Sequence, residues 1–83
     1  MEYLSTGKFL RVLKKCDPAV RQDVAHAIRR FQAGEREALG FHKLHGKLAA
    51  FHAFSANFSY RVIVKITKTA AYYVDVGTHD IYD

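Results

Sequence analysis

The chain has 83 residues, which suffices for one domain with a small hydrophobic core and leaves no room for a second domain. Its hydrophobic content of 49% excludes a disordered chain, and no run approaches the roughly 20 apolar residues that span a bilayer. Lys and Arg outnumber Asp and Glu by 13 to 8, and the resulting net charge of +5 favours a polyanion or an acidic protein as partner.

Two helices are predicted in the first third of the chain. Ser5 or Thr6 can cap a helix that runs to about Cys16. Asp17-Pro18 then predicts the start of a second helix, because Asp is a good N-cap and Pro suits the first helical position. Apolar residues at helical spacing continue to Gly34, a typical residue at a helix C-terminus. We therefore expect an antiparallel helical hairpin.

From about Phe41 the spacing of apolar residues changes from about 3.6 residues, typical of a helix, to two residues, typical of a strand. Residues 59–66 predict a strand whose Val62 and Val64 face the core while Arg61 and Lys65 face the other way. A second strand is expected over residues 70–76, and an earlier one carries His52. The predicted fold class is α+β, a single domain over residues 1–83 with an N-terminal helical hairpin packed on a small antiparallel β-sheet.

The acidic residue in the last strand bears on the register of this hairpin. A three-residue loop over residues 67–69 pairs Ile66 with Ala70 and places Arg61 opposite Asp75 on the outer face. A two-residue loop exchanges the two faces of the second strand and turns Asp75 into the core, where a carboxylate without a partner is costly. We therefore expect the three-residue loop and an Arg61–Asp75 pair.

Positive charge is concentrated in the middle of the chain, where no acidic residue occurs between Glu37 and Asp75. Arg61 and Lys65 suit phosphate binding, since both carry charge and Arg adds a two-pronged donor. We expect His52 to point the same way, and His79 to follow the Gly77-Thr78 turn. Histidine exchanges a proton near neutral pH, so a base, an acid and a cation for cleaving RNA through its own 2′-hydroxyl are present without a metal. The residues expected to bind the RNA around this site are Lys43, His45, Lys47, Lys65 and Tyr82.

Several of these residues also have a purely structural interpretation. His26 is expected on a helix surface, and His52 is better explained as a residue on the surface of a sheet than as a catalyst. Tyr82 can equally pack back on the sheet. His42 and His45 form an H-x-x-H pair, a weak zinc signal with no cysteine nearby. Cys16 stands alone, which excludes an internal disulfide and favours the cytoplasm.

Three ordered blocks resemble the RelE/ParE toxin superfamily of type II toxin–antitoxin systems. They are LHGKL at residues 44–48, YRVIV at residues 60–64 and VGTHDIY at residues 76–82. Each block alone is weak, but the last two combined are fairly specific. The spacing from His42 to the Gly-Thr-His turn is most similar to the YafQ-like branch, and the resemblance covers roughly residues 40–83.

The resemblance implies a toxin that cleaves mRNA, typically in the ribosomal A site, without a metal or other cofactor, and that a cognate antitoxin binds. By the same resemblance His79 donates a proton and Arg61 stabilises the transition-state phosphate. His42 matches a further active-site histidine, His52 stands where relatives carry a catalytic lysine, and Tyr82 matches a common C-terminal tyrosine.

The sequence departs from the family at Ser55 and Ser59, where YafQ-like enzymes have a histidine and an aspartate. The general base therefore stays open between His42 and His52. Two further functions fit the same residues. One is a ParE-like protein that poisons DNA gyrase by binding, and the other is a module that binds RNA or the ribosome without cutting.

Overall fold

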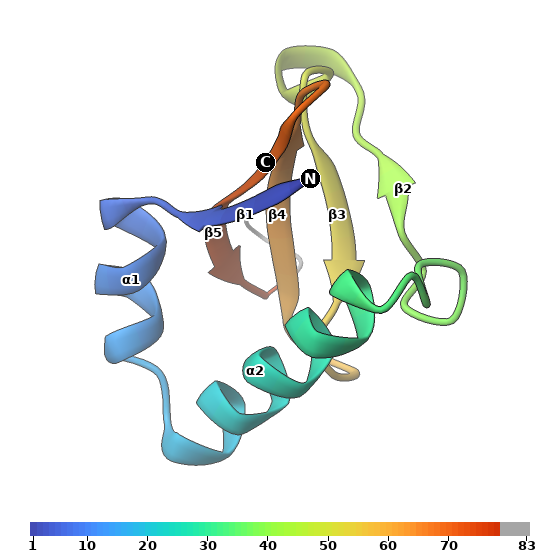
Figure 1. Cartoon of the computed structure of the whole chain (residues 1–83). Helices are drawn as coiled ribbons and strands as arrows, with labels where there is room; N and C mark the ends of the chain where they lie inside the picture. Colours follow the sequence, from blue (N-terminus) through green and yellow to red (C-terminus); the bar gives the residue numbers. More distant parts are fainter. Residues whose placement is uncertain (79–83) are drawn as a thin grey trace.

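A five-stranded mixed sheet with two helices on one face forms the protein (Figure 1), in a computed structural model that describes residues 1–78. The helices are α1 (Gly7–Lys14) and α2 (Pro18–Gln32), and a short 3₁₀ helix, η1 (Gly46–Leu48), follows later. Across the sheet the strands are β1 (Glu2–Ser5), β5 (Ala70–Gly77), β4 (Arg61–Ile66), β3 (His52–Ser55) and β2 (His42–Lys43). The predicted α+β class is confirmed. No helix within the described residues has the length and apolar character needed to cross a membrane.

The chain begins with a strand, so the predicted N-terminal helical hairpin on an antiparallel sheet is wrong. Strand β1 lies parallel to β5, with Glu2 opposite Ala70 and Ser5 opposite Tyr73, and this makes the sheet mixed. Helix α1 starts directly afterwards, where the Thr6 side chain accepts a hydrogen bond of 3.2 Å from the backbone N–H of Phe9. The residues of β1, Glu2-Tyr3-Leu4-Ser5, do not alternate between apolar and polar, so only the pairing with β5 reveals this strand.

Helix α2 follows the sequence prediction closely. It begins at Pro18 after Asp17, which has extended backbone angles but makes no side-chain capping bond. It ends at Gln32, and Gly34 beyond it has a φ of 90°, a conformation that glycine adopts without strain. In Figure 1 α2 crosses the front of the sheet, while α1 lies beside the edge formed by β1 and β5. The two helices thus cover one side, called here the helix face.

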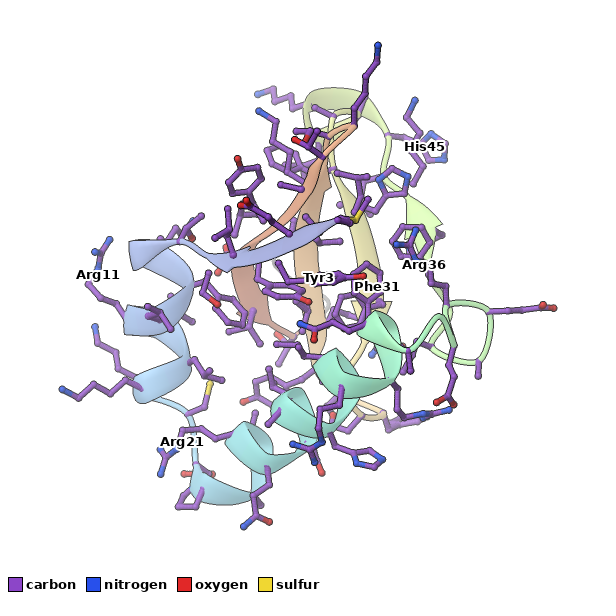
Figure 2. The ribbon with its side chains drawn as sticks, viewed as in Figure 1. Tyr3, Arg11, Arg21, Phe31, Arg36 and His45 are labelled. Carbon is purple, nitrogen blue, oxygen red and sulfur yellow. The ribbon has the colours of Figure 1, made fainter. Side chains whose placement is uncertain are left out.

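Aromatic side chains fill the core between the helices and the sheet. Phe31 of α2 stacks on Phe54 of β3 with ring centroids 4.7 Å apart, and both side chains are fully buried. Figure 2 shows Tyr3 and Phe31 pointing inward and Arg11 and Arg21 pointing away from the core. The sheet contributes further buried residues, namely Val62, Val64, Ala71, Tyr73 and Val76. The prediction that Val62 and Val64 face the core is confirmed.

The turn between β4 and β5 is one residue shorter than predicted. The backbone N–H of Thr67 donates to the carbonyl of Ala70 over 2.8 Å, and Ile66 pairs with Ala71, so only Lys68 and Thr69 form the loop. The expected pairing of Ile66 with Ala70 is therefore wrong. The Thr67 hydroxyl accepts from the N–H of Ala70 at 3.0 Å and stabilises this tight turn.

A bulge in β5 explains why the short turn does not bury Asp75. Val64 pairs with Tyr73, but the next pair is Ile63 with Asp75, so Val74 is an extra residue in the strand. Tyr73 and Val76 both reach the core, whereas Val74 and Asp75 lie on the opposite side. The predicted Arg61–Asp75 pair is wrong because Arg61 pairs with Gly77 instead.

The side of the sheet away from the helices, called here the distal face, is partly apolar. Leu44, Ala53 and Ile63 are buried there in a second cluster. The segment over residues 44–51 folds across this face, and its Leu48 and Phe51 pack on the cluster. The distal face is therefore a thin second core with polar residues around its margin, and it offers a surface on which a ligand can lie.

Candidate functional site

Arg61 lies on the distal face at the first residue of β4. Its neighbours across the sheet are Ser55 of β3 and Gly77 of β5. Residues directly opposite in a β-ladder share a face, so Ser55 and Arg61 point to the same side. Gly77 begins the Gly-Thr-His segment. His79, two residues further on, and Tyr82 lie outside the described residues.

The Arg61 guanidinium also braces the loop that joins β3 to β4. Its Nη1 donates to three backbone carbonyls, those of Asn57 at 3.0 Å, Phe58 at 3.2 Å and Tyr60 at 3.2 Å. The side chain is only partly exposed. Arg61 therefore holds the backbone of residues 57–60 while its charge remains at the margin of the distal face.

Asn57 gives the same loop a fixed shape. Its Oδ1 accepts from the N–H groups of Ser59 and Tyr60, both at 2.8 Å, and its Nδ2 donates to Asp23 of α2 at 2.8 Å. This rigid loop presents Phe58, whose side chain is 94% exposed. Because the Phe58 ring buries almost no surface, hydrogen bonds rather than packing of this ring fix the loop. Phe58 was not predicted from the sequence, where its only signal is an aromatic residue next to a turn.

His42 shares the distal face with Arg61. It pairs with Ala53, which belongs to the distal cluster and lies two residues from Ser55 on the same face. The Nδ1 atom of His42 lies 2.8 Å from the carbonyl oxygen of Gly40. A carbonyl can only accept, so Nδ1 carries the proton and the neutral ring has its lone pair on Nε2. This is the tautomer of a base at Nε2.

His52 lies on the opposite side of the sheet, and the expectation that it points the same way as Arg61 is wrong. It pairs with Val64, a core residue of the helix face. Its ring stacks on Phe41 at 4.8 Å, and its Nδ1 is buried without a hydrogen-bond partner within residues 1–78. Burial lowers the pKa of His52 below 6.5, and the charges of Lys43 and Arg36 lower it further. His52 is thus a neutral packing residue at neutral pH.

The remaining predicted RNA-binding residues are spread around the molecule. Lys65 is on the distal face but four residues from Arg61, a distance of about 13 Å along a strand. Lys43 pairs with His52 and so belongs to the helix face at the edge of the sheet. His45 and Lys47 are exposed at η1. The guanidinium of Arg36, a residue not predicted from the sequence to belong to the site, lies over the rings of Phe31 and Phe41, 4.6 and 5.1 Å from their centroids.

Other histidines and acidic residues do not gather into a cluster in the described part of the chain. No three side chains of His, Cys, Asp or Glu among residues 1–78 come close enough together to hold a metal ion. His26 is exposed on α2, as the sequence predicted. On the distal face, His42, Ser55 and Arg61 lie on the neighbouring strands β2, β3 and β4, and Gly77 of β5 lies next to Arg61.

Comparison with solved structures shows that this is the fold of the RelE/ParE toxins. YafQ from E. coli strain BL21(DE3) superposes with a TM-score of 0.81 at 12% identity, covering 96% of this chain and 94% of YafQ. The YoeB/ParE toxin from Agrobacterium tumefaciens gives 0.77 at 14% identity, covering 95% and 99%. A chain of the toxin–antitoxin complex RelBE2 from Mycobacterium tuberculosis gives 0.67 at 23% identity, covering 94% and 96%. No protein-family model and no curated protein matches the sequence.

Proposed function

We propose that this protein is the toxin of a type II toxin–antitoxin pair and acts as an endoribonuclease on mRNA at the ribosome. One observation carries the proposal: Arg61 pairs with Gly77, the residue that begins Gly77-Thr78-His79, and shares its face with His42. RNA cleavage requires a cation that binds the phosphate, a base and an acid. In the proposal Arg61 is the cation, His42 is the base, and His79, which closely follows Gly77 in sequence, is the acid. The toxin fold and the resemblance of the sequence blocks support the same function.

The proposed reaction is attack of a ribose 2′-hydroxyl on the adjacent phosphate. His42 Nε2 takes the proton of the 2′-hydroxyl, and the oxygen forms a bond to phosphorus. Arg61 stabilises the negative charge on the phosphate as the bond to the 5′-oxygen breaks, and His79 gives that oxygen its proton. The position of His52 on the helix face favours His42 as the general base. The products are a 2′,3′-cyclic phosphate and a 5′-hydroxyl end.

Phe58 extends the proposed RNA-binding surface. The loop fixed by Asn57 and Arg61 carries this 94%-exposed side chain, and Arg61 donates a hydrogen bond to the backbone carbonyl of Phe58 itself. A nucleotide whose phosphate contacts Arg61 therefore has an aromatic platform close by. Bases of every type stack on such rings, which strengthens RNA binding without requiring a particular sequence.

An acidic antitoxin is the proposed protein partner. The net charge of +5 favours association with an acidic chain. Among the similar structures, YafQ occurs in a complex with DinJ and RelBE2 is a toxin–antitoxin complex. Co-expression with the product of the adjacent reading frame is expected to restore growth and to yield a co-purifying complex.

Mapping of mRNA ends in expressing cells tests the proposed function. The unaltered protein is expected to arrest growth and to produce new 5′-hydroxyl ends within coding regions. His79→Gln and His42→Gln each remove a proton-transfer group and are expected to reduce cleavage by about 100-fold or more. His26→Gln is the matched control, because His26 is exposed on α2 and takes no part in the proposed reaction.

Persistence of growth arrest and of the same cleavage pattern in His79→Gln would contradict the proposed acid. Growth arrest with no new RNA ends in the unaltered protein would contradict nuclease activity altogether. In that case an assay of DNA supercoiling by gyrase distinguishes a gyrase poison from a protein that only binds RNA, which instead shows salt-sensitive affinity for ribosomes.

A further inference from the structure

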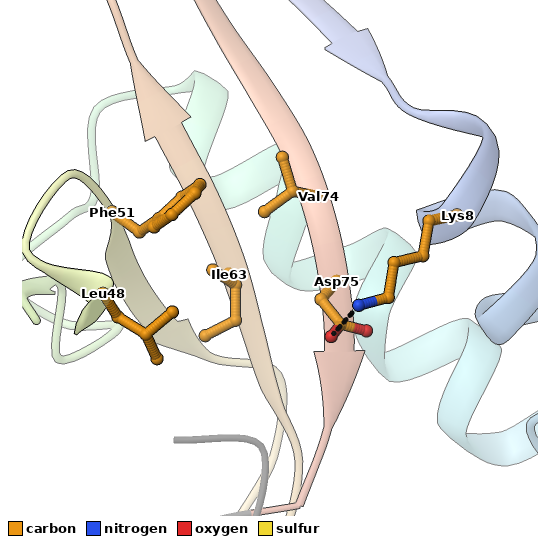
Figure 3. Close-up of a pocket in the computed structure, with 6 residues that line it drawn as sticks. All are labelled: Lys8, Leu48, Phe51, Ile63, Val74 and Asp75. Atoms are coloured by element: carbon orange, nitrogen blue, oxygen red, sulfur yellow. Dashed lines mark ion pairs between the residues drawn. The ribbon is translucent and has the colours of Figure 1, made fainter. Parts of the chain in front are cut away.

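A hollow of about 230 Å³ opens on the distal face beside the proposed phosphate site (Figure 3). Its floor and one wall are apolar, and a single ion pair stands at the other side, as the close-up shows. The residues that line it are Lys8, Leu48, Phe51, Ile63, Val74 and Asp75. An apolar concavity with a few polar groups at one edge is the usual form of a site for a small planar molecule.

The polar edge of the hollow consists of Asp75 and Lys8. Lys8 Nζ lies 3.2 Å from Asp75 Oδ2, and Asp75 Oδ1 accepts a 2.9 Å hydrogen bond from the N–H of Val76. A carboxylate has about four acceptor positions, so these two bonds leave each oxygen able to accept one more. The side chain of Asp75 is 24% exposed and that of Lys8 is 64% exposed. Acceptors and a donor therefore stand side by side at the rim.

The hollow lies one step along the sheet from Arg61. Ile63 pairs with Asp75, and Arg61 pairs with Gly77, so the two sites are two residues apart on neighbouring strands. Two residues of a strand span about 7 Å. A nucleotide with its phosphate at Arg61 can therefore reach the hollow with an adjoining base, without passing over the helices.

We propose that this hollow binds a guanine base of the RNA substrate, a proposal that rests on the nuclease function proposed above. The apolar walls formed by Phe51, Ile63 and Val74 would cover the ring, and the polar edge would bind the Watson–Crick edge of guanine. The two Asp75 oxygens accept from N1–H and from the 2-amino group, and Lys8 donates to O6. Guanine is the base that offers two adjacent donors followed by an acceptor. Adenine and cytosine place an acceptor next to their single amino group, and uracil has one donor between two acceptors.

Substitution of guanine by inosine gives a direct test, because inosine lacks only the 2-amino group. Purified protein would be assayed on ribosomes programmed with mRNAs that carry G, A, C, U or inosine at each position around the cleavage site. We expect one position at which guanine is cleaved roughly tenfold or more faster than inosine, as a bidentate contact to a base predicts. Asp75→Asn is expected to slow cleavage of the guanine substrate and to bring the guanine-to-inosine ratio close to one.

Lys8→Met is the matched control for stability. It breaks the same ion pair as Asp75→Asn but keeps the carboxylate that recognises the 2-amino group. Both variants are expected to melt at similar temperatures, yet Lys8→Met should retain the guanine-to-inosine ratio. If the two variants lose the ratio equally, the carboxylate is not the reader and the proposal is wrong.

Failure of this proposal is distinguishable from failure of the proposed function. Cleavage with equal rates for guanine and inosine at every position would overturn the guanine site and leave the nuclease intact. If the protein cleaves no RNA, binding decides: methyl NMR signals of Leu48, Ile63 and Val74 should shift with GMP and not with CMP. Absence of any shift with GMP overturns the site, and so does a result in which only a bound protein partner shifts these methyl signals.

Discussion

Replacement of Arg61 by alanine separates the chemical role of this residue from its structural one. The guanidinium braces the β3–β4 loop through one nitrogen, Nη1, which has two hydrogens for three carbonyls. Hydrogen bonds from a charged group contribute about 1.5–3 kcal/mol each, and partial exposure places this set at the lower end. We expect Arg61→Ala to lower the free energy of unfolding by about 1–2 kcal/mol, which lowers the melting temperature by about 5–15 °C in a domain of this size.

The expected effect of Arg61→Ala on cleavage is larger than its effect on stability. Removal of one group that stabilises transition-state charge typically lowers kcat by about 10²–10³. Asn57→Ala provides the comparison, since it removes two bonds to backbone N–H groups and the link to Asp23 while keeping the guanidinium. It should cost a similar 1–2 kcal/mol of stability but less than about tenfold in cleavage. Equal losses of cleavage in the two variants, measured well below both melting temperatures, would refute a chemical role for Arg61.

Two further predictions concern Phe58 and His52. Phe58→Ala should leave the melting temperature unchanged, because the ring is 94% exposed. It should raise KM for RNA by about fivefold or more, and Phe58→Trp should restore the original KM. A KM in Phe58→Ala equal to that of the unaltered protein would exclude stacking. Because the folded-state pKa of His52 is below 6.5, the unfolded chain takes up the proton first as the pH falls, so folding stability should decrease below about pH 6.5. Melting curves between pH 7.5 and 5 should show a weaker decrease in His52→Gln, and parallel curves for the two proteins would contradict this assignment.

The parts of the fold that the sequence predicts are those with a local cause. Asp17-Pro18 and Gly34 mark the ends of α2, and the alternation at Val62 and Val64 identifies the core face of β4. Strand β1 had no such cause, since it exists only through pairing with β5, which is 65 or more residues away. Contacts of this separation leave no signature in a four-residue segment.

Arg61 and His42 share a face of the sheet, whereas His52, which was expected to point the same way as Arg61, lies on the other face. The error at His52 arose because the register between β3 and β4 was not predicted, and a shift of one residue turns a side chain to the other face. The register of β5 failed for a different reason. The cost of burying Asp75 was judged correctly, but the chain avoids it with a bulge at Val74 rather than with a longer turn.

The bulge also makes Val74 a supernumerary residue in the ladder. If Val74 were deleted, the hairpin would be uninterrupted and its pairing would not change. The two-residue turn already fixes which residues face each other, so Asp75, Val76 and Gly77 would still pair with Ile63, Val62 and Arg61. Length can therefore change by one at this point of β5 without rearranging the packing beneath the helices. Deletion of Val74 would change the lining of the hollow on the distal face, because Val74 is one of its lining residues. This surface can therefore vary during evolution while the core under the helices is retained.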